Sequence, residues 1–416
     1  MTGAKGCAHS SRSASRLFAA PEASRNANAR PGGSELTSSA PLRGTVVVEI
    51  GHSVAAPYAG LVLAQLGAEV IKVEHPDGGD PARQWGQRLQ DGASPLFHAL
   101  NRDKLGAAVD LRNRSARDAL LRLIVDRADV LIQNLRPNSI EALGFGAAEL
   151  AVRKPSLIYC SLSAFGSRGP MASRPGYDAL MQAYGGLMSI TGEEGRPPVR
   201  VGVSIIDIGS GLWSVIGILA ALLERARVAT GGLVETSLYE TALAWMGIPL
   251  AEFSAWGADP QRCGSGAPAI VPYEIFATAD GSLMVAAGND SLFNKLCILV
   301  ERRHWVADER FCTNPARVEH RAALSAELQA IFLTGSTSEW RKRLDACGIP
   351  NAPLHKVSEV MSDEQTAALG ILEVVPNTNI TAVGLPIRFD GMRSRVRGRA
   401  PRLGEHLQAP VCPSEP

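Results

Sequence analysis

Short apolar runs alternate with helical stretches through the first half of the chain. Five of the runs have the length and composition of buried strands: residues 45–50, 69–73, 107–111, 129–133 and 157–162. The helical stretches between them are residues 57–66, 115–127 and 139–152, and Ser115 is the expected N-cap of the second. Strands that alternate with helices pair in parallel through right-handed crossovers. The pattern therefore predicts an α/β, Rossmann-like doubly wound domain, with ligands at the carboxyl ends of its strands.

The pattern changes in the second half of the chain. Residues 205–260 are expected to be largely helical, and an Asp280–Gly281 turn between two apolar runs predicts a β-hairpin. Further elements follow: helical stretches at 291–300, 317–332 and 338–346, and a strand-like segment at 384–390. This second unit reads as a smaller α+β domain.

These patterns divide the chain into five segments. They are a disordered N-terminal extension (1–42), a large α/β domain (43–230), a helical linker (231–262), a small α+β domain (263–350) and a return segment that completes the large domain (351–416). The extension is rich in Ser, Ala, Arg and Asn, a composition typical of disorder. Its Arg/Ser-rich, acid-poor residues 10–20 also fit an organelle transit peptide. We expect a cytoplasmic protein, with a mitochondrial location as the alternative.

Composition excludes several classes of partner. Lys and Arg number 42 against 41 Asp and Glu, so the chain lacks the basic surplus that nucleic-acid binding requires. The longest strongly apolar stretch, Leu212 to Leu223, is too short to span a bilayer. Seven scattered cysteines without a C-x-x-C pair, and histidines without metal-ligand spacing, predict neither a disulfide framework nor a metal site. After the first strand the chain reads Gly51-His-Ser-Val-Ala-Ala-Pro57 rather than G-x-G-x-x-G, so we expect no nicotinamide or flavin cofactor.

One carboxylate is a candidate for chemistry. Asp178 ends a loop rich in Gly, Pro, Ser and Arg that follows the strand-like run at 157–162. A carboxylate beside such a backbone can act as a nucleophile if N–H groups stabilise the oxyanion it creates. The alternative is that Asp178 caps a helix that starts at Ala179.

Several blocks of this chain, in order, resemble the class III (CaiB/BaiF) CoA-transferases. They are residues 49–60, 66–83, 100–104, 109–111, 129–137, 143–145, 174–178 (Arg-Pro-Gly-Tyr-Asp), 186–192, 348–353 and 403–406. The resemblance implies that Asp178 is the nucleophile, that CoA thioesters are substrates without a tightly bound cofactor, and that two chains form an interlocked-ring homodimer. A carboxylate suits CoA transfer because it can form an anhydride and then a thioester.

The resemblance also implies which residues bind CoA. They lie after the predicted strands: His52, Ser53, Val54, Ala55, Asn101, Lys104, Asn134 and Leu135. The chain departs from formyl-CoA transferases at His75, Ala142 and Ser163, where those enzymes carry cations. The nearest candidate cations for the CoA phosphates are Arg102, Lys104 and Arg136, and the alternative is that these are solvated surface charges.

The block at 264–276 looks closest to the branch that transfers CoA from succinyl-CoA to dicarboxylic acids. Gly264 and Gly266 stand where the family has a mobile glycine loop over the active site, which makes them candidate oxyanion donors. The distal carboxylate of a dicarboxylic acid needs a cation, and Arg174 and Arg200 are candidates because the guanidinium group binds carboxylates in a bidentate manner. The alternatives are that Arg174 makes a structural contact in its loop and that the glycines form an ordinary turn.

Two other functions remain open at this level. An α-methylacyl-CoA racemase has the same fold and uses a His/Asp acid–base pair, with the His about thirty residues before the Asp. Here residue 148 is Ala and no histidine occurs between His98 and His304, so a substitute His52 or His98 has the wrong spacing. The other alternative is a non-catalytic CoA-binding protein, against which the intact Arg-Pro-Gly-Tyr-Asp motif argues.

Overall fold

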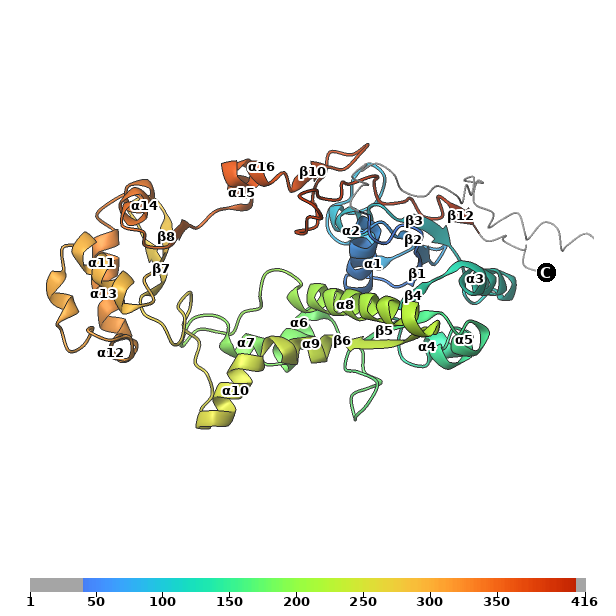
Figure 1. The fold of residues 1–416 in the computed structure, drawn as a ribbon, viewed down its shortest axis with the longest axis horizontal. Helices are drawn as coiled ribbons and strands as arrows, with labels where there is room; N and C mark the ends of the chain where they lie inside the picture. Colours follow the sequence, from blue (N-terminus) through green and yellow to red (C-terminus); the bar gives the residue numbers. More distant parts are fainter. Residues whose placement is uncertain (1–39, 409–416) are drawn as a thin grey trace, which may run out of the picture. The chain divides into compact units, whose positions relative to one another are not determined.

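A computed structural model describes residues 40–408, which form two compact units (Figure 1). Unit 1 contains residues 40–185, 202–245 and 369–408, and unit 2 contains residues 186–201 and 246–368. The chain therefore leaves unit 1 twice and returns to it twice. Most of the predicted N-terminal extension lies outside the described residues.

Unit 1 is built on a parallel sheet of seven strands in the order β12-β3-β2-β1-β4-β5-β6. The strands are β1 (Val46–Ile50), β2 (Glu69–Glu74), β3 (Leu105–Ala108), β4 (Val130–Gln133), β5 (Ile158–Ser163), β6 (Gly232–Ser237) and β12 (Leu407–Gln408). A small antiparallel pair, β10 (Leu372–Val374) and β11 (Thr381–Val383), belongs to the return segment. The predicted α/β class with a parallel sheet is confirmed.

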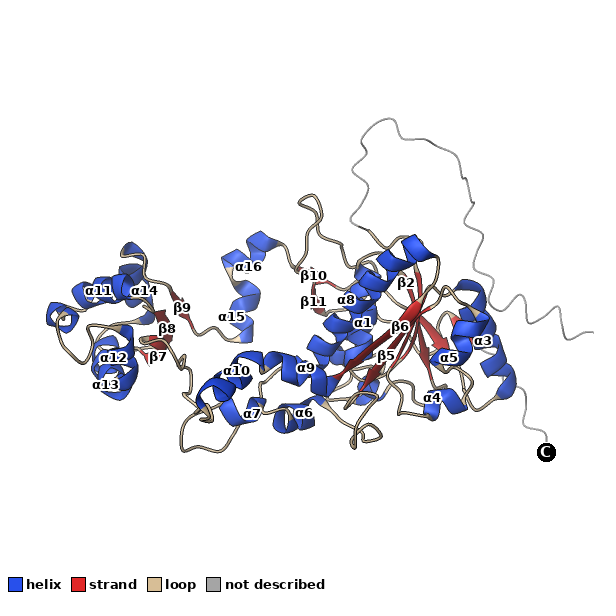
Figure 2. Ribbon diagram, turned by 60° about the horizontal axis from the view of Figure 1, so that its bottom comes forward, coloured by secondary structure: helices blue, strands red, loops and turns tan. Residues whose placement is uncertain are grey.

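Helices cover both faces of this sheet (Figure 2). They are α1 (Ala55–Gln65), α2 (Pro95–Asn101), α3 (Arg114–Arg127), α4 (Ser139–Ala142), α5 (Ala147–Arg153), α6 (Asp178–Tyr184), α8 (Ile205–Val228) and α9 (Leu238–Trp245). On one face, Val48 and Ile71 of the strands share a buried apolar core with Leu120 of α3 and Leu150 of α5. On the other face α8 packs against α1, β5 and β6.

Several predicted elements of unit 1 were wrong in detail. Residues 205–260 are not continuously helical, because α8 ends at Ala229 in the left-handed conformation and β6 follows. Gly231 allows the chain to pass from α8 into β6 close to the residues before β5, since a Cβ at this position would lie 1.9 Å from the carbonyl oxygen of Leu157. The N-cap of α3 is Asn113 rather than Ser115, and Gly144, at a φ of +82°, lies in the break between α4 and α5. The segment 384–390 forms no strand.

Unit 2 contains a three-stranded antiparallel sheet and several short helices. The strands are β7 (Tyr273–Ala277), β8 (Ser282–Ala286) and β9 (Asn351–Pro353), and β7 and β8 form the predicted hairpin. The helices are α7 (Leu187–Ile190), α10 (Gly247–Trp256), α11 (Asp290–Leu299), α12 (Asn314–Glu319), α13 (Arg321–Phe332), α14 (Thr337–Ala346), α15 (Val357–Ser362) and α16 (Glu364–Leu369). A core of aromatic and aliphatic side chains, including Phe276, Phe332 and Trp340, joins the sheet to α13 and α14.

A cluster of buried charges lies in unit 1 between β1, β2 and α1. Lys72 Nζ is 3.0 Å from Glu49 Oε1 and 2.9 Å from Asp80 Oδ2, and it donates to the carbonyl oxygen of Gly51 at 2.9 Å. Lys104 Nζ binds the other oxygen of Glu49 at 2.7 Å. Burial alone lowers the pKa of Lys72, but the charges of Glu49 and Asp80 outweigh it and raise that pKa. Burial lowers the pKa of Lys104 to about 8.

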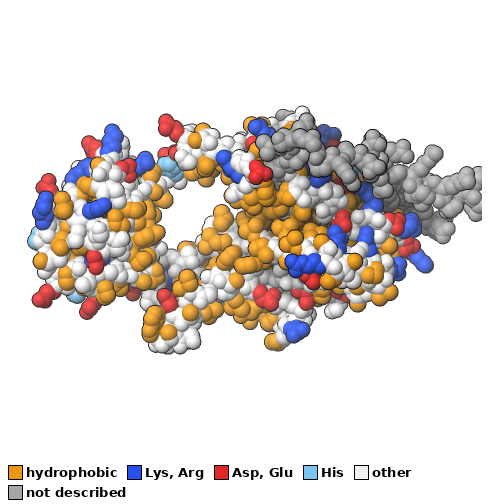
Figure 3. All heavy atoms as spheres, viewed as in Figure 1, with side chains coloured by type: hydrophobic (Ala, Val, Ile, Leu, Met, Phe, Trp, Pro, Cys, Tyr) orange, Lys and Arg blue, Asp and Glu red, His pale blue; other side chains and the backbone are white. Residues whose placement is uncertain are grey.

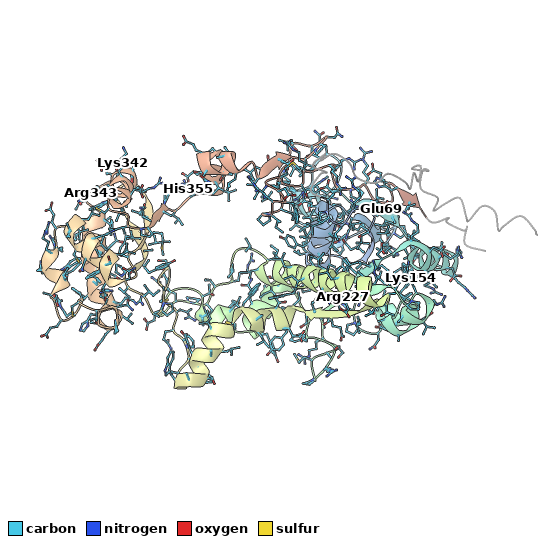
Figure 4. The ribbon with its side chains drawn as sticks, in the orientation of Figure 1. Glu69, Lys154, Arg227, Lys342, Arg343 and His355 are labelled. Carbon is cyan, nitrogen blue, oxygen red and sulfur yellow. The ribbon has the colours of Figure 1, made fainter. Side chains whose placement is uncertain are left out.

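We predict that Lys72→Met lowers the unfolding free energy of unit 1 by about 3–5 kcal/mol, because it leaves buried carboxylates without their partner. Urea unfolding followed by tryptophan fluorescence would measure the change. Lys342→Met is the matched control, since Lys342 is exposed on α14 (Figure 4) and the same substitution there should stay within about 0.5 kcal/mol. Equal stability of the two variants would contradict the structural role of the cluster.

Candidate active site

Both oxygens of the Asp178 carboxylate are held by hydrogen bonds. Gln182 Nε2 donates to Oδ1 at 2.6 Å, and the backbone N–H groups of Ile206 and Asp207 donate to Oδ2 at 2.8 and 3.3 Å. Asp178 is 6% exposed. It is the first residue of α6, whose N-cap is Tyr177, so the alternative that Asp178 caps this helix was wrong.

The local sequence explains this arrangement. Residues four apart face the same side of a helix, which brings Gln182 beside Asp178 on α6. The first N–H groups of a helix have no partner within it and carry the positive end of the helix dipole. Two such groups at the start of α8 point at the carboxylate, so fixed dipoles hold the anion.

A second carboxyl group lies beside Asp178. Burial raises the pKa of Asp207 to about 7, and the negative charge of Asp178 adds to the effect. Asp207 is therefore partly protonated near neutral pH. Below neutral pH this keeps a second full negative charge away from the nucleophile candidate.

The turn after β1 is fixed by two other side chains. Ser53 has a φ of +70°, and its N–H donates to Asp80 Oδ1 at 3.0 Å. The Asn134 side chain accepts from the N–H of His52 at 3.0 Å and donates to its carbonyl oxygen at 2.9 Å. Burial lowers the pKa of His52, and although Asp80 opposes this, the positive charges of Lys72 and Arg136 add to the lowering. His52 is therefore neutral at physiological pH.

A cavity of about 210 Å³ opens at the carboxyl ends of β1 to β4. Its apolar lining comes from residues on and after these strands: Ile50, Val73, Val109, Leu111, Leu135 and Leu143. Its polar lining includes His52, His75, Asp80 and Arg112. A larger cavity of about 600 Å³ lies at the ends of β4 to β6 and shares Leu135 with the first. These are the positions at which an open parallel sheet binds ligands.

The predicted CoA-binding residues lie in two places in unit 1. His52, Ser53, Val54 and Ala55 form the turn and the start of α1, and Asn134, Leu135 and Arg136 follow β4 beside it. Asn101 is buried in α2, where Lys104 Nζ donates to its Oδ1 at 2.9 Å. Lys104 also donates to the carbonyl oxygen of Pro57, so its three N–H donors all meet protein oxygens.

The two other candidate cations have different surroundings. Arg102 is buried, and its Nη2 donates to the carbonyl oxygen of Val383 at 2.6 Å. Arg136 is exposed, and its positive charge contributes to lowering the pKa of His52. Arg112, which sequence reasoning missed, is an exposed cation on the lining of the smaller cavity, with its Nη2 2.9 Å from His75 Nε2.

The remaining candidates lie on loops. Arg174 is exposed on the loop before Asp178. Arg200, Gly264 and Gly266 belong to unit 2. There, the N–H of Gly264 donates to the carbonyl oxygen of Gly192 at 2.9 Å, and that of Gly266 donates to Cys263 at 2.9 Å. These bonds hold the glycine loop to its own unit.

Sequence reasoning also missed the residues that hold Asp178 and the turn. Gln182 could have been found from its spacing of four residues from Asp178. The partners Ile206 and Asp80 had no comparable signal, because their contacts depend on how α8 and the chain after β2 fold back onto the site.

The comparisons with known proteins agree on one family. A model of CoA-transferase family III matches residues 42–407. The succinate–glutarate CoA-transferase of Agrobacterium fabrum (strain C58) is 38% identical over 380 residues, which cover 88% of this chain and 94% of that protein. The succinyl-CoA:glutarate CoA-transferase of Mus musculus is 32% identical over 379 residues, covering 90% and 86%. The crystal structure of a CAIB/BAIF family protein from Brucella suis superposes with a TM-score of 0.80 at 37% identity, covering 89% of this chain and 98% of that one.

We predict that Asp207→Asn changes how stability depends on pH. The pKa of Asp207 rises from 3.8 to about 7 on folding, so the folded state binds more protons between these values and the wild type loses stability as pH rises through them. The variant has no such group. The free energy of unfolding of the variant, relative to that of the wild type, should therefore increase between pH 5 and pH 8 by on the order of 2 kcal/mol. Calorimetry across this range checks it, and a constant difference would contradict it.

Proposed function

Because the chain belongs to CoA-transferase family III, we propose that it moves CoA from succinyl-CoA to a small dicarboxylic acid through an aspartyl-CoA thioester on Asp178. The observation that carries the role of Asp178 is the set of three hydrogen bonds that fix its buried carboxylate. A nucleophile reacts efficiently when it is held in one orientation, and these hydrogen bonds hold the Asp178 carboxylate in one orientation.

The proposed reaction conserves atoms and charge at each step. An oxygen of Asp178 attacks the thioester carbonyl carbon, the carbon–sulfur bond breaks, and CoA leaves as the thiolate with a mixed anhydride behind it. The thiolate then attacks Cγ of Asp178, which releases the donor acid and forms the aspartyl-CoA thioester. The acceptor carboxylate repeats these steps in reverse order and departs as its CoA ester.

The two cavities at the sheet edge support a CoA site in unit 1. The smaller cavity has an apolar lining suited to a nucleobase, and the N-terminus of α1 at Ala55 suits a phosphate. Arg112, which lines this cavity, and Arg136, whose charge acts on His52 of the same lining, are proposed to bind the CoA phosphates. Lys104, Arg102 and Asn101 are proposed to support this site from within the fold.

The acceptor class rests on the relatives. Proteins named for succinate–glutarate, succinyl-CoA:glutarate and succinyl-CoA–D-citramalate transfer share 32–38% identity with this chain. Arg174, on the exposed loop before Asp178, is proposed to bind the distal carboxylate of the acceptor. A racemase function is not favoured, because in the described chain the hydrogen bonds to Asp178 come from an amide and backbone N–H groups rather than from an imidazole.

The exposed face of α8 supports a homodimer. By length and composition this 24-residue helix could cross a membrane, and it is longer than the apolar stretch recognised in the sequence. One face packs on the sheet, and the other exposes Leu212, Trp213, Ile216 and Leu223 by 40–70%. Hydrophobic side chains gather over α8 and α9 (Figure 3). Such a patch marks an interaction site, and we propose that a second copy of the chain covers it.

A substrate screen tests the proposed function. With succinyl-CoA as donor and glutarate, citramalate, mesaconate, itaconate or malate as acceptor, we expect at least one new CoA ester by mass spectrometry. Asp178→Ala should reduce its formation at least about 10³-fold while CoA binding persists, because the acyl carrier is lost. Activity with monocarboxylyl-CoA donors alone would contradict the dicarboxylate assignment, and full turnover by Asp178→Ala would contradict the role of Asp178.

Sedimentation velocity tests the dimer. We expect a species of twice the 44.0 kDa chain mass, and weaker association after Ile216→Asp, which places a charge on the apolar face of α8. Val152→Asp is the control, since Val152 is an exposed apolar residue on α5, outside this patch. A fully active wild-type monomer would contradict the proposal.

A further inference from the structure

Gln182 is a buried polar side chain that the proposed reaction does not yet use. It is fully buried, and its Nε2 donates to Asp178 Oδ1 at 2.6 Å. The opposite oxygen, Oδ2, faces the N–H groups of Ile206 and Asp207. The two oxygens of Asp178 therefore have different partners: a side-chain amide on one side and a helix N-terminus on the other.

We infer that these two sets of donors have separate tasks in the reaction. This inference rests on the proposed function. When the CoA thiolate attacks Cγ of the anhydride, a carbon–sulfur bond forms and the carbonyl oxygen of Asp178 takes the negative charge. Oδ2 receives two N–H donors and is the oxygen that bears this charge. Oδ1 is then the oxygen that attacks the donor thioester and later leaves with the donor acid.

Gln182 is the positioning residue of this arrangement. By donating to Oδ1 it keeps the attacking oxygen turned away from the α8 N-terminus, and it stabilises the same oxygen when the bond between Cγ and Oδ1 breaks. The amide is suited to both tasks because it is neutral. A cation at this place would pair with the carboxylate and weaken it as a nucleophile.

Two shape-matched substitutions separate this role from simple packing. Gln182→Met keeps the length and volume of the side chain and removes the donor, so kcat should fall about 10- to 100-fold, the effect of losing one hydrogen bond to a charged group. Gln182→Glu keeps the shape but places another carboxylate against Asp178, so kcat should fall further, by more than about 100-fold. The dissociation constant of CoA should change by less than about threefold in both, because Gln182 contacts Asp178 rather than CoA.

Gln329→Met is the matched control. Gln329 makes two hydrogen bonds with the backbone of Ala277 in unit 2, and this variant should keep wild-type kcat. Wild-type kcat in Gln182→Met and Gln182→Glu, with Asp178→Ala inactive, would overturn the inference and leave the proposed function standing. The inference would also be overturned if the loss of kcat in Gln182→Met came with an equal loss of CoA affinity and of thermal stability. Turnover by Asp178→Ala would instead overturn the proposed function itself.

Discussion

The close packing of α8 on α1 is the constraint on which the site depends. Gly211 makes it possible, because a Cβ at this position would lie 2.8 Å from the carbonyl oxygen of Ala55. The start of α8 holds Asp178, and the start of α1 forms the turn at His52 to Ala55. One helix–helix contact thus fixes the distance between the carboxylate and the turn proposed to bind CoA. Glycine serves here because it allows close approach of two backbones.

Buried charged groups in unit 1 are stabilised in two different ways. At Asp178 the anion is stabilised by backbone dipoles and an amide, and the neighbouring Asp207 avoids its own charge through a raised pKa. Beneath the turn, Lys72 bridges Glu49, Asp80 and the backbone of Gly51. In both, fixed buried groups meet the charge, so the geometry does not depend on exposed ion pairs.

The sequence predicted the regular parts of the fold because they depend on local patterns. The strands before residue 163 and the hairpin at β7 and β8 follow from apolar runs and turn residues. The strand β6 was missed because its short, half-exposed sequence lies between two strongly apolar helices. Asp178 was found from its loop and motif, but the partners Ile206 and Asp207 lie 28 and 29 residues away and meet it only through tertiary packing. The burial of Lys104 likewise could not be predicted from the sequence, since most lysines lie on the protein surface.

The proposed reaction requires that Asp178 carry CoA covalently during turnover. Incubation of the protein with succinyl-CoA in the absence of an acceptor acid, followed by acid quenching, digestion and mass spectrometry, measures it most directly. We expect the peptide containing Asp178 to gain the mass of CoA less one water, and hydroxylamine to convert this adduct to an aspartyl hydroxamate. An enzyme that is active but forms its adduct at another residue, or forms none under these conditions, would contradict the account.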